Sequence, residues 1–267
     1  MELPDTEEAT LNSTVSSTPQ RPASSPPTRE DLSDGFDQAA GRYDLMVALN
    51  PGYRRHLRTA AELLVASIEH PTPTLLDLGC GSGLSTLELL RAARRRGMTP
   101  RIIGVDASTG MLAQAERHRW PQGVTFVHGC GESLDELGPP PAHGALACYL
   151  LRNVTDLDAT LAGIAAALGP GAPFVAEDYS VRGSADAQRR WHAVNRGVIL
   201  PLAKVLTDDA GVYEYLHSSV DDFSTMPELA DQLHRAGFSD VASRTVRGWQ
   251  RDILHIIHAS APHEHRR

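Results

Sequence analysis

The sequence predicts an α/β protein with a doubly wound, mostly parallel seven-stranded sheet, and three observations support this fold class. Strand-like apolar segments alternate with amphipathic helical segments over residues 74–176. The first such strand, Thr74–Leu78, runs into the glycine-rich loop Gly79–Gly83, which opens a helix. The second strand, Arg101–Val105, ends at Asp106. Parallel strands need crossover helices, so this order indicates βαβ units with a ligand site at the carboxyl edge of the sheet.

The individual elements follow from periodicity and from helix breakers. Two helices are expected before the first strand, one from Glu30 to the breaker at residues 50–52 and one over residues 53–68. Five further strands and four further helices follow. The strands are expected at 124–128, 146–150, from 173, at 241–246 and at 252–259, and the helices at 84–96, 108–118, 156–168 and 226–236. Ser108 has the residue type and position of a helix N-cap.

One folded domain with two unstructured ends is expected. Residues 1–30 form a disordered tail, because half of them are Ser, Thr or Pro and none is aromatic. Residues 31–262 form the domain, in which the helices of 31–70 cap the carboxyl edge of the sheet and a helical insertion at 182–222 covers the substrate. Residues 263–267 are a polar tail.

Composition excludes several classes of protein. The chain has 267 residues, 41% of them hydrophobic, and a net charge of −8, which disfavours a nucleic-acid binder. Its three cysteines form no C-x-x-C pair, which favours a reducing compartment. The acidic N-terminus has no apolar segment typical of a secretory signal, and no stretch approaches the roughly 18 apolar residues of a membrane span. We therefore expect a cytoplasmic protein with at most a peripheral membrane contact.

The glycine loop indicates a nucleoside site. Glycine tolerates positive φ and leaves room for a ligand beside the backbone amides at a helix N-terminus. A dinucleotide site would have the spacing G-x-G-x-x-G, whereas here Gly79, Gly81 and Gly83 alternate with small residues after Asp77. This string, followed by Asp106 on the next strand, resembles motif I of the class I S-adenosylmethionine (SAM) methyltransferases.

The resemblance implies SAM as methyl donor, with Asp106 at the ribose and no metal. Residues 129–132 resemble a G-D-A-E segment that often contacts adenine in methyltransferases, with Cys and Gly in place of Asp and Ala. The expected donor-site residues are Asp77, Gly79, Cys80, Gly81, Ser82, Asp106, Ala107, Met111, Cys130, Gly131, Glu132, Cys148 and Tyr43.

A second segment narrows the family. Residues 148–156 contain Leu-Arg-Asn-Val-Thr-Asp, which resembles the L-R-N-V-T-D segment of the ubiquinone/menaquinone C-methyltransferases. Tyr43-Asp44-Leu45-Met46, residues 168–171 and residues 178–180 match further signatures, and the resemblance covers roughly residues 33–258. The chain also departs from these signatures. The differing residues are Val47, Pro51, Arg55, Arg58, Ala166, Gly169 and Asp178.

The resemblance therefore implies a divergent SAM-dependent methyltransferase that methylates a carbon of a quinol, aromatic or prenyl/polyketide-type small molecule. The expected partner is this apolar or aromatic acceptor, and a homodimer is left open. Three alternatives stay open: O-methylation, a SAM-binding protein that does not methylate (a partner subunit or a cyclase), and an NAD-dependent oxidoreductase, which the glycine spacing disfavours.

Candidate catalytic residues come from two regions. Arg152 and Asn153 follow the fourth strand, where an arginine could stabilise a developing phenolate or could instead pair with a carboxylate and brace the loop. Tyr213 and His217 lie one helical turn apart, and His192 precedes them on the insertion. Histidine titrates near neutral pH and suits a general base.

Overall fold

The computed structural model describes Asp37 and residues 52–131, 134, 141–199, 201 and 219–263. The expected N-terminal tail, the first expected helix apart from Asp37, and most of the C-terminal tail lie outside these residues. The division of the chain into tail, cap, domain and insertion therefore stays a prediction.

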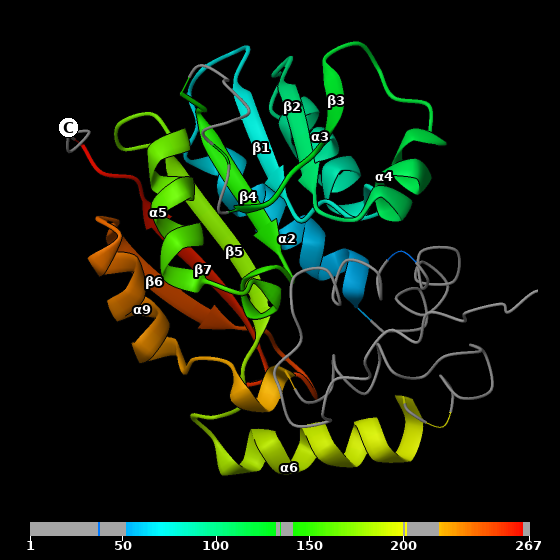
Figure 1. Cartoon of the computed structure of the whole chain (residues 1–267), viewed down its shortest axis with the longest axis vertical. Coiled ribbons are helices and arrows are strands. Elements are labelled where there is room, and N and C mark those ends of the chain that lie inside the picture. The colour runs from blue at the N-terminus through cyan, green and yellow to red at the C-terminus, as the bar shows by residue number, and fades with distance from the viewer. Residues whose placement is uncertain are drawn as a thin grey trace, which may run out of the picture.

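A seven-stranded sheet forms the centre of the molecule, in the order β3-β2-β1-β4-β5-β7-β6 (Figure 1). All neighbouring strands are parallel except β7, which is antiparallel to both β5 and β6. This confirms the predicted doubly wound, mostly parallel sheet. Its strands are β1 (Thr74–Leu78), β2 (Arg101–Asp106), β3 (Val124–His128), β4 (Gly144–Cys148), β5 (Pro173–Tyr179), β6 (Ser239–Thr245) and β7 (Leu254–Ser260).

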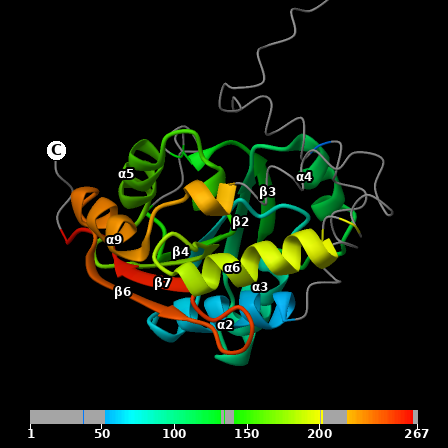
Figure 2. The same cartoon turned by 90° about the horizontal axis from the view of Figure 1, so that it is seen from below.

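Helices cover both faces of the sheet, with α2 and α3 on one face and α5 and α9 on the other (Figure 2). The helix bounds agree with the predicted ones to within about two residues. They are α2 (Tyr53–Ala66), α3 (Leu84–Arg95), α4 (Thr109–Glu116), α5 (Leu157–Ala167), α6 (Ala185–Val194) and α9 (Met226–Arg235), with a 3₁₀ turn η2 (Leu151–Asn153) and a π-helical turn η3 (Asn195–Ile199). Ser108, the predicted N-cap of α4, accepts a hydrogen bond from the amide of Met111.

Helix α2, from the predicted cap, packs along α3, β4 and β5, and its first two turns approach the carboxyl edge of the sheet. Strand β4 begins and ends two residues earlier than predicted, at Gly144 and Cys148. Helix α6, from the predicted insertion, crosses below the carboxyl ends of β4 and β5 (Figures 1 and 2).

Candidate functional site

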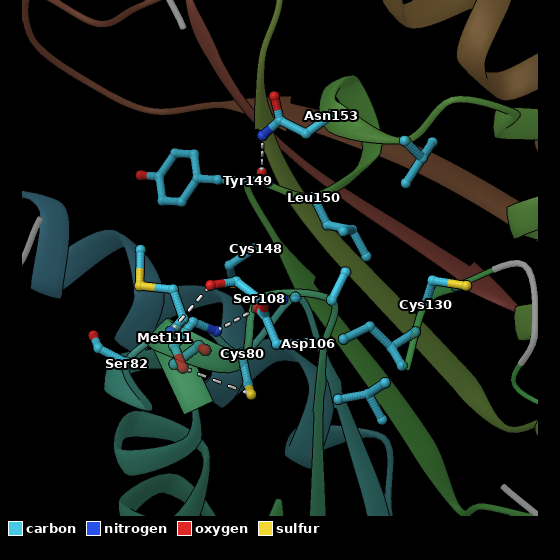
Figure 3. A pocket seen from close by; sticks show the side chains of 18 of the residues that line it. Cys80, Ser82, Asp106, Ser108, Met111, Cys130, Cys148, Tyr149, Leu150 and Asn153 are labelled. Atoms are coloured by element: carbon cyan, nitrogen blue, oxygen red, sulfur yellow. Dashed lines mark hydrogen bonds between the residues drawn. The ribbon is translucent and has the colours of Figure 1, made fainter. Parts of the chain in front are cut away.

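A pocket opens at the carboxyl edge of the sheet, where β1, β2 and β4 end (Figure 3). Its empty volume is about 1120 Å³, including space open to solvent, so it has room for a small-molecule ligand. Three regions line it: the loop after β1, the ends of β2 and β3 with the start of α4, and the end of β4 with the first turns of α2.

The loop after β1 is an amide cradle whose shape depends on glycine. Gly79, Gly81 and Gly83 have φ values of 65°, 52° and 89°, a region that strongly favours glycine. A Cβ at Gly81 would meet no atom within 4 Å, so this residue borders open space in the pocket wall. The amides of Gly79 and Cys80 donate to the carbonyl of Val105 at 2.8 and 3.1 Å, which holds the loop against β2.

Asp77, predicted to bind the donor, is not among the residues that line the pocket. Its fully buried carboxylate accepts hydrogen bonds from the hydroxyls of Ser85 (2.8 Å) and Thr86 (2.5 Å). Burial raises the pKa of Asp77 to about 7, although the two hydroxyl donors oppose this shift. The geometry therefore gives Asp77 a bracing role between β1 and the start of α3.

Asp106 lies at the end of β2 with its carboxylate at the pocket. One carboxylate oxygen accepts from the amide of Gly81 at 2.7 Å and the other from the amide of Ser108 at 2.9 Å. Because two carboxylate oxygens offer about four acceptor positions, two positions are left for a ligand. Burial raises the pKa of Asp106, and the two amide donors counteract it.

The next part of the wall comes from two neighbouring strand ends. Ala107, Ser108 and Met111 line the pocket from the start of α4, and Cys130 and Gly131 line it after β3 (Figure 3). The structure therefore brings the predicted ribose residue and the predicted adenine segments together. Ser82, Gly79, Cys80, Gly81 and Cys148 line the same pocket, as predicted.

The wall at the end of β4 is aromatic. Tyr149 follows the strand with φ of 59°, a left-handed conformation that is rare for a bulky residue and common at functional sites. Its ring stacks on Tyr53 of α2, with centroids 5.1 Å apart and an interplanar angle of 10°. Asn153 lines the pocket and donates from its amide nitrogen to the carbonyl of Tyr149 at 2.8 Å.

Arg152, the leading catalytic candidate, does not line the pocket. Its side chain is 5% exposed and forms an ion pair with Asp178, which is fully buried, at 2.5 Å. The guanidinium also lies 5.8 Å from the ring centre of Tyr149 and 5.5 Å from that of Tyr179. This is the carboxylate pairing that the sequence left open, and it braces the turn that carries Tyr149 and Asn153.

Of the remaining candidates, the structure describes only His192. On α6, the Nε2 atom of His192 lies 3.3 Å from a carboxylate oxygen of Asp221, and His192 does not line the pocket. Four further candidates lie outside the residues that the structure describes, and their roles stay predictions. They are Tyr43, Glu132, Tyr213 and His217.

Several pocket residues were not predicted as site residues. Tyr53 and Leu57 were assigned to a cap, and Tyr149 and Leu150 to a strand. Tyr149 carried a usable signal, because it stands two residues before the start of the L-R-N-V-T-D segment.

The strand order, the glycine loop and the acid that ends β2 define a class I SAM-dependent methyltransferase. Comparison with known families identifies the methyltransferase family. The chain belongs to the ubiE/COQ5 methyltransferase family, whose profile matches residues 27–249.

Curated relatives cover most of the chain. A demethylmenaquinone methyltransferase of Beutenbergia cavernae is 30% identical over 223 residues, which are 82% of this chain and 87% of that relative. A ubiquinone/menaquinone biosynthesis C-methyltransferase UbiE of Bradyrhizobium diazoefficiens is 29% identical over 226 residues, 81% of this chain and 87% of that one.

Solved structures show the same fold. The [4+2]-cyclase SpnF superposes with a TM-score of 0.61 at 16% identity over 88% of this chain and 97% of its own. A Haemonchus contortus phosphoethanolamine N-methyltransferase in complex with SAM also gives a TM-score of 0.61 at 16% identity, over 86% of this chain and 60% of its own. Within the described residues, no helix has the length and apolar character needed to cross a membrane.

Proposed function

We propose that this enzyme transfers a methyl group from SAM to a ring carbon of a quinol, such as a demethylmenaquinol-type acceptor. The observation that carries the proposal is the aromatic and aliphatic wall beside the amide cradle. Tyr53, Leu57, Leu84, Leu150 and Val154 line it. Such a wall suits a flat apolar ring. Family membership supports the same choice, because a relative that is 30% identical is a demethylmenaquinone methyltransferase.

The donor fits the cradle end of the pocket. SAM supplies an electrophilic methyl group on a sulfonium when it is bound. Asp106 would accept hydrogen bonds from its ribose hydroxyls, using the acceptor positions that Gly81 and Ser108 leave over. Ala107, Met111 and Cys130 would enclose the adenine.

The end of β4 would position the acceptor. Methyl transfer needs the reacting carbon about 3 Å from the methyl group and in line with the leaving sulfur. The Tyr149 ring and Asn153 lie on the turn that Arg152 and Asp178 brace, so this turn would set the acceptor's orientation. Loss of a phenolic proton would make the ring carbon nucleophilic. Tyr213 and His217 stay sequence-based candidates for the group that receives this proton.

The test is turnover with labelled SAM and a panel of reduced and oxidised quinones that lack the ring methyl group. We expect the label to appear in the product only with reduced acceptors, with the new methyl on carbon by NMR. A methyl ether would support O-methylation instead. Binding of SAM without turnover on any acceptor would support the non-methylating alternative. The Asp106→Ala variant controls for background methylation.

A further inference from the structure

Asp37 contacts the donor site from a part of the chain far from it in sequence. One oxygen of its carboxylate accepts hydrogen bonds from the hydroxyl of Ser108 and from the amide of Gly110, the latter at 2.8 Å. The other oxygen accepts from the hydroxyl of Thr109 at 3.3 Å. Three consecutive residues at the start of α4 therefore donate to one carboxylate.

The backbone of α4 leaves space for this contact. A Cβ at Gly110 would lie 3.0 Å from the Oδ1 atom of Asp37, 3.1 Å from its Cα and 3.2 Å from its carbonyl oxygen. Two of these three atoms are backbone, which cannot rotate away. Gly110 thus permits an approach of Asp37 that a side chain at position 110 would obstruct.

Ser108 connects Asp37 to the ribose residue. Its hydroxyl donates to Asp37 and accepts from the amide of Met111, so both functions of the hydroxyl are used. Its own amide donates to Asp106 at 2.9 Å, and Asp106 in turn accepts from Gly81 at 2.7 Å. A continuous chain of hydrogen bonds therefore runs from Asp37 through Ser108 and Asp106 to the amide cradle.

Charge favours the same arrangement. Burial raises the pKa of Asp37, but the hydrogen bonds from Ser108, Gly110 and Thr109 outweigh it and lower the pKa below its usual value. Asp37 is therefore ionised at neutral pH, and its negative charge lies at the positive end of the α4 dipole. Burial is the main cause that raises the pKa of Asp106; the charge of Asp37 raises this pKa further, and the charge of His128 lowers it.

We propose that Asp37 is a positioning residue of the donor site, which acts through Ser108 to hold the Asp106 carboxylate in the orientation that receives the ribose hydroxyls. This role concerns the donor alone. It is independent of which acceptor is methylated, so its test does not use an acceptor to measure binding.

The first experiment is calorimetric titration of the full chain with S-adenosylhomocysteine, the demethylated product. We expect Asp37→Ala to weaken binding about tenfold, the size of one charge-assisted hydrogen bond. Asp37→Asn, which keeps an acceptor oxygen, should restore most of the affinity. The matched control is Asp186→Ala, which removes an exposed acid from the first turn of α6 and should bind like the parent protein.

A double-mutant cycle separates positioning through Ser108 from independent effects. If Asp37 acts through Ser108, the Asp37→Ala/Ser108→Ala pair should lose no more affinity than the worse single variant. With an acceptor that supports turnover, Asp37→Ala should raise KM for SAM while kcat at saturating SAM changes less than about twofold.

The pH dependence of product binding in Asp37→Asn tests the proposal even if Asp37→Ala proves too unstable to measure. In Asp37→Asn the negative charge beside Asp106 is gone, so the acid limit of product binding should move to lower pH. Unchanged affinity in Asp37→Ala, additive losses in the double variant or an unmoved acid limit would each overturn the proposal. The absence of methylation with every acceptor would leave it intact, since that result bears only on the proposed function.

Discussion

Replacing Glu177 by Gln should stabilise the protein, and increasingly so as pH rises. Glu177 lies on β5 and is fully buried, and neither carboxylate oxygen has a hydrogen-bond partner among the described residues that meets ordinary geometry. The Tyr149 hydroxyl is close enough to lower the pKa of Glu177 somewhat, but burial dominates and raises it to about 8. Gln has nearly the same shape and no charge to bury.

The size of the effect follows from linkage. The pKa of Glu177 is about 8 in the folded protein and 4.5 is its ordinary value. At about 1.36 kcal/mol per pKa unit, this difference corresponds to roughly 5 kcal/mol as an upper bound. The folded state binds the proton on Glu177 more tightly than the unfolded state does. Its contribution to the free energy of unfolding is therefore complete below pH 4.5 and is lost as pH rises to about 8. At pH 7 the wild type should have lost roughly 3 kcal/mol of it.

The assay is urea unfolding of wild type and Glu177→Gln at intervals between pH 5 and pH 9. We expect the difference in unfolding free energy to be small at pH 5 and to grow in favour of Gln, reaching a plateau above pH 8. Glu69→Gln, at an exposed position, serves as the control and should show no such growth. A difference that does not change with pH, or a Gln variant less stable than wild type at pH 9, would refute the reasoning.

Three further predictions concern the site. Asp106→Ala should weaken S-adenosylhomocysteine binding by about 10- to 100-fold in calorimetry, because charged hydrogen bonds contribute about 1.5–3 kcal/mol, and equal affinity would remove Asp106 from the ribose site. Gly81→Ala should lower SAM affinity and cost about 1–2 kcal/mol of stability, since φ is 52° there; unchanged KM and melting temperature would contradict the cradle. Arg152→Ala should lose turnover together with about 3–5 kcal/mol of stability in urea unfolding, because it leaves Asp178 buried and unpaired. Lost turnover at full stability would instead mean that Arg152 acts directly on the acceptor.

The fold could be predicted largely from local patterns, because apolar periodicity, caps and breakers are short-range signals. Ser108 shows this, since residue type and position sufficed to identify the cap. Strand β4 shows the limit. Its first residue is Gly144, which has a low strand propensity, yet a Cβ there would lie 3.3 Å from the side chain of Leu64 on α2 and 3.0 Å from that of Ile68, just after α2. Close packing against α2 selects glycine at this position, and no local pattern reports that contact.

The site likewise has features that local sequence patterns predict and features that they do not. The position of Asp106 at the pocket could be predicted, because the acid and the glycine loop belong to consecutive βα units. The Arg152–Asp178 pair could not, because 26 residues separate the two side chains and only the β4–β5 pairing brings them together. The left-handed backbone conformation of Tyr149 could not be predicted either, because a tyrosine gives no sequence signal for positive φ.

The departure from the G-D-A-E pattern at Gly131 has a packing reason. A Cβ at Gly131 would lie 2.6 Å from the Cγ2 atom of Thr160 on α5, and a Cβ at Gly163 would lie 2.7 Å from the carbonyl oxygen of Gly131. Two glycines therefore allow α5 and the loop after β3 to approach more closely than alanine would permit. Glycine at position 131 is therefore explained by the close packing of α5 against the pocket wall. This packing reason does not require that the site has lost SAM binding. Because the wall there can contact adenine through its backbone, the donor pocket can keep its function while its side chains change.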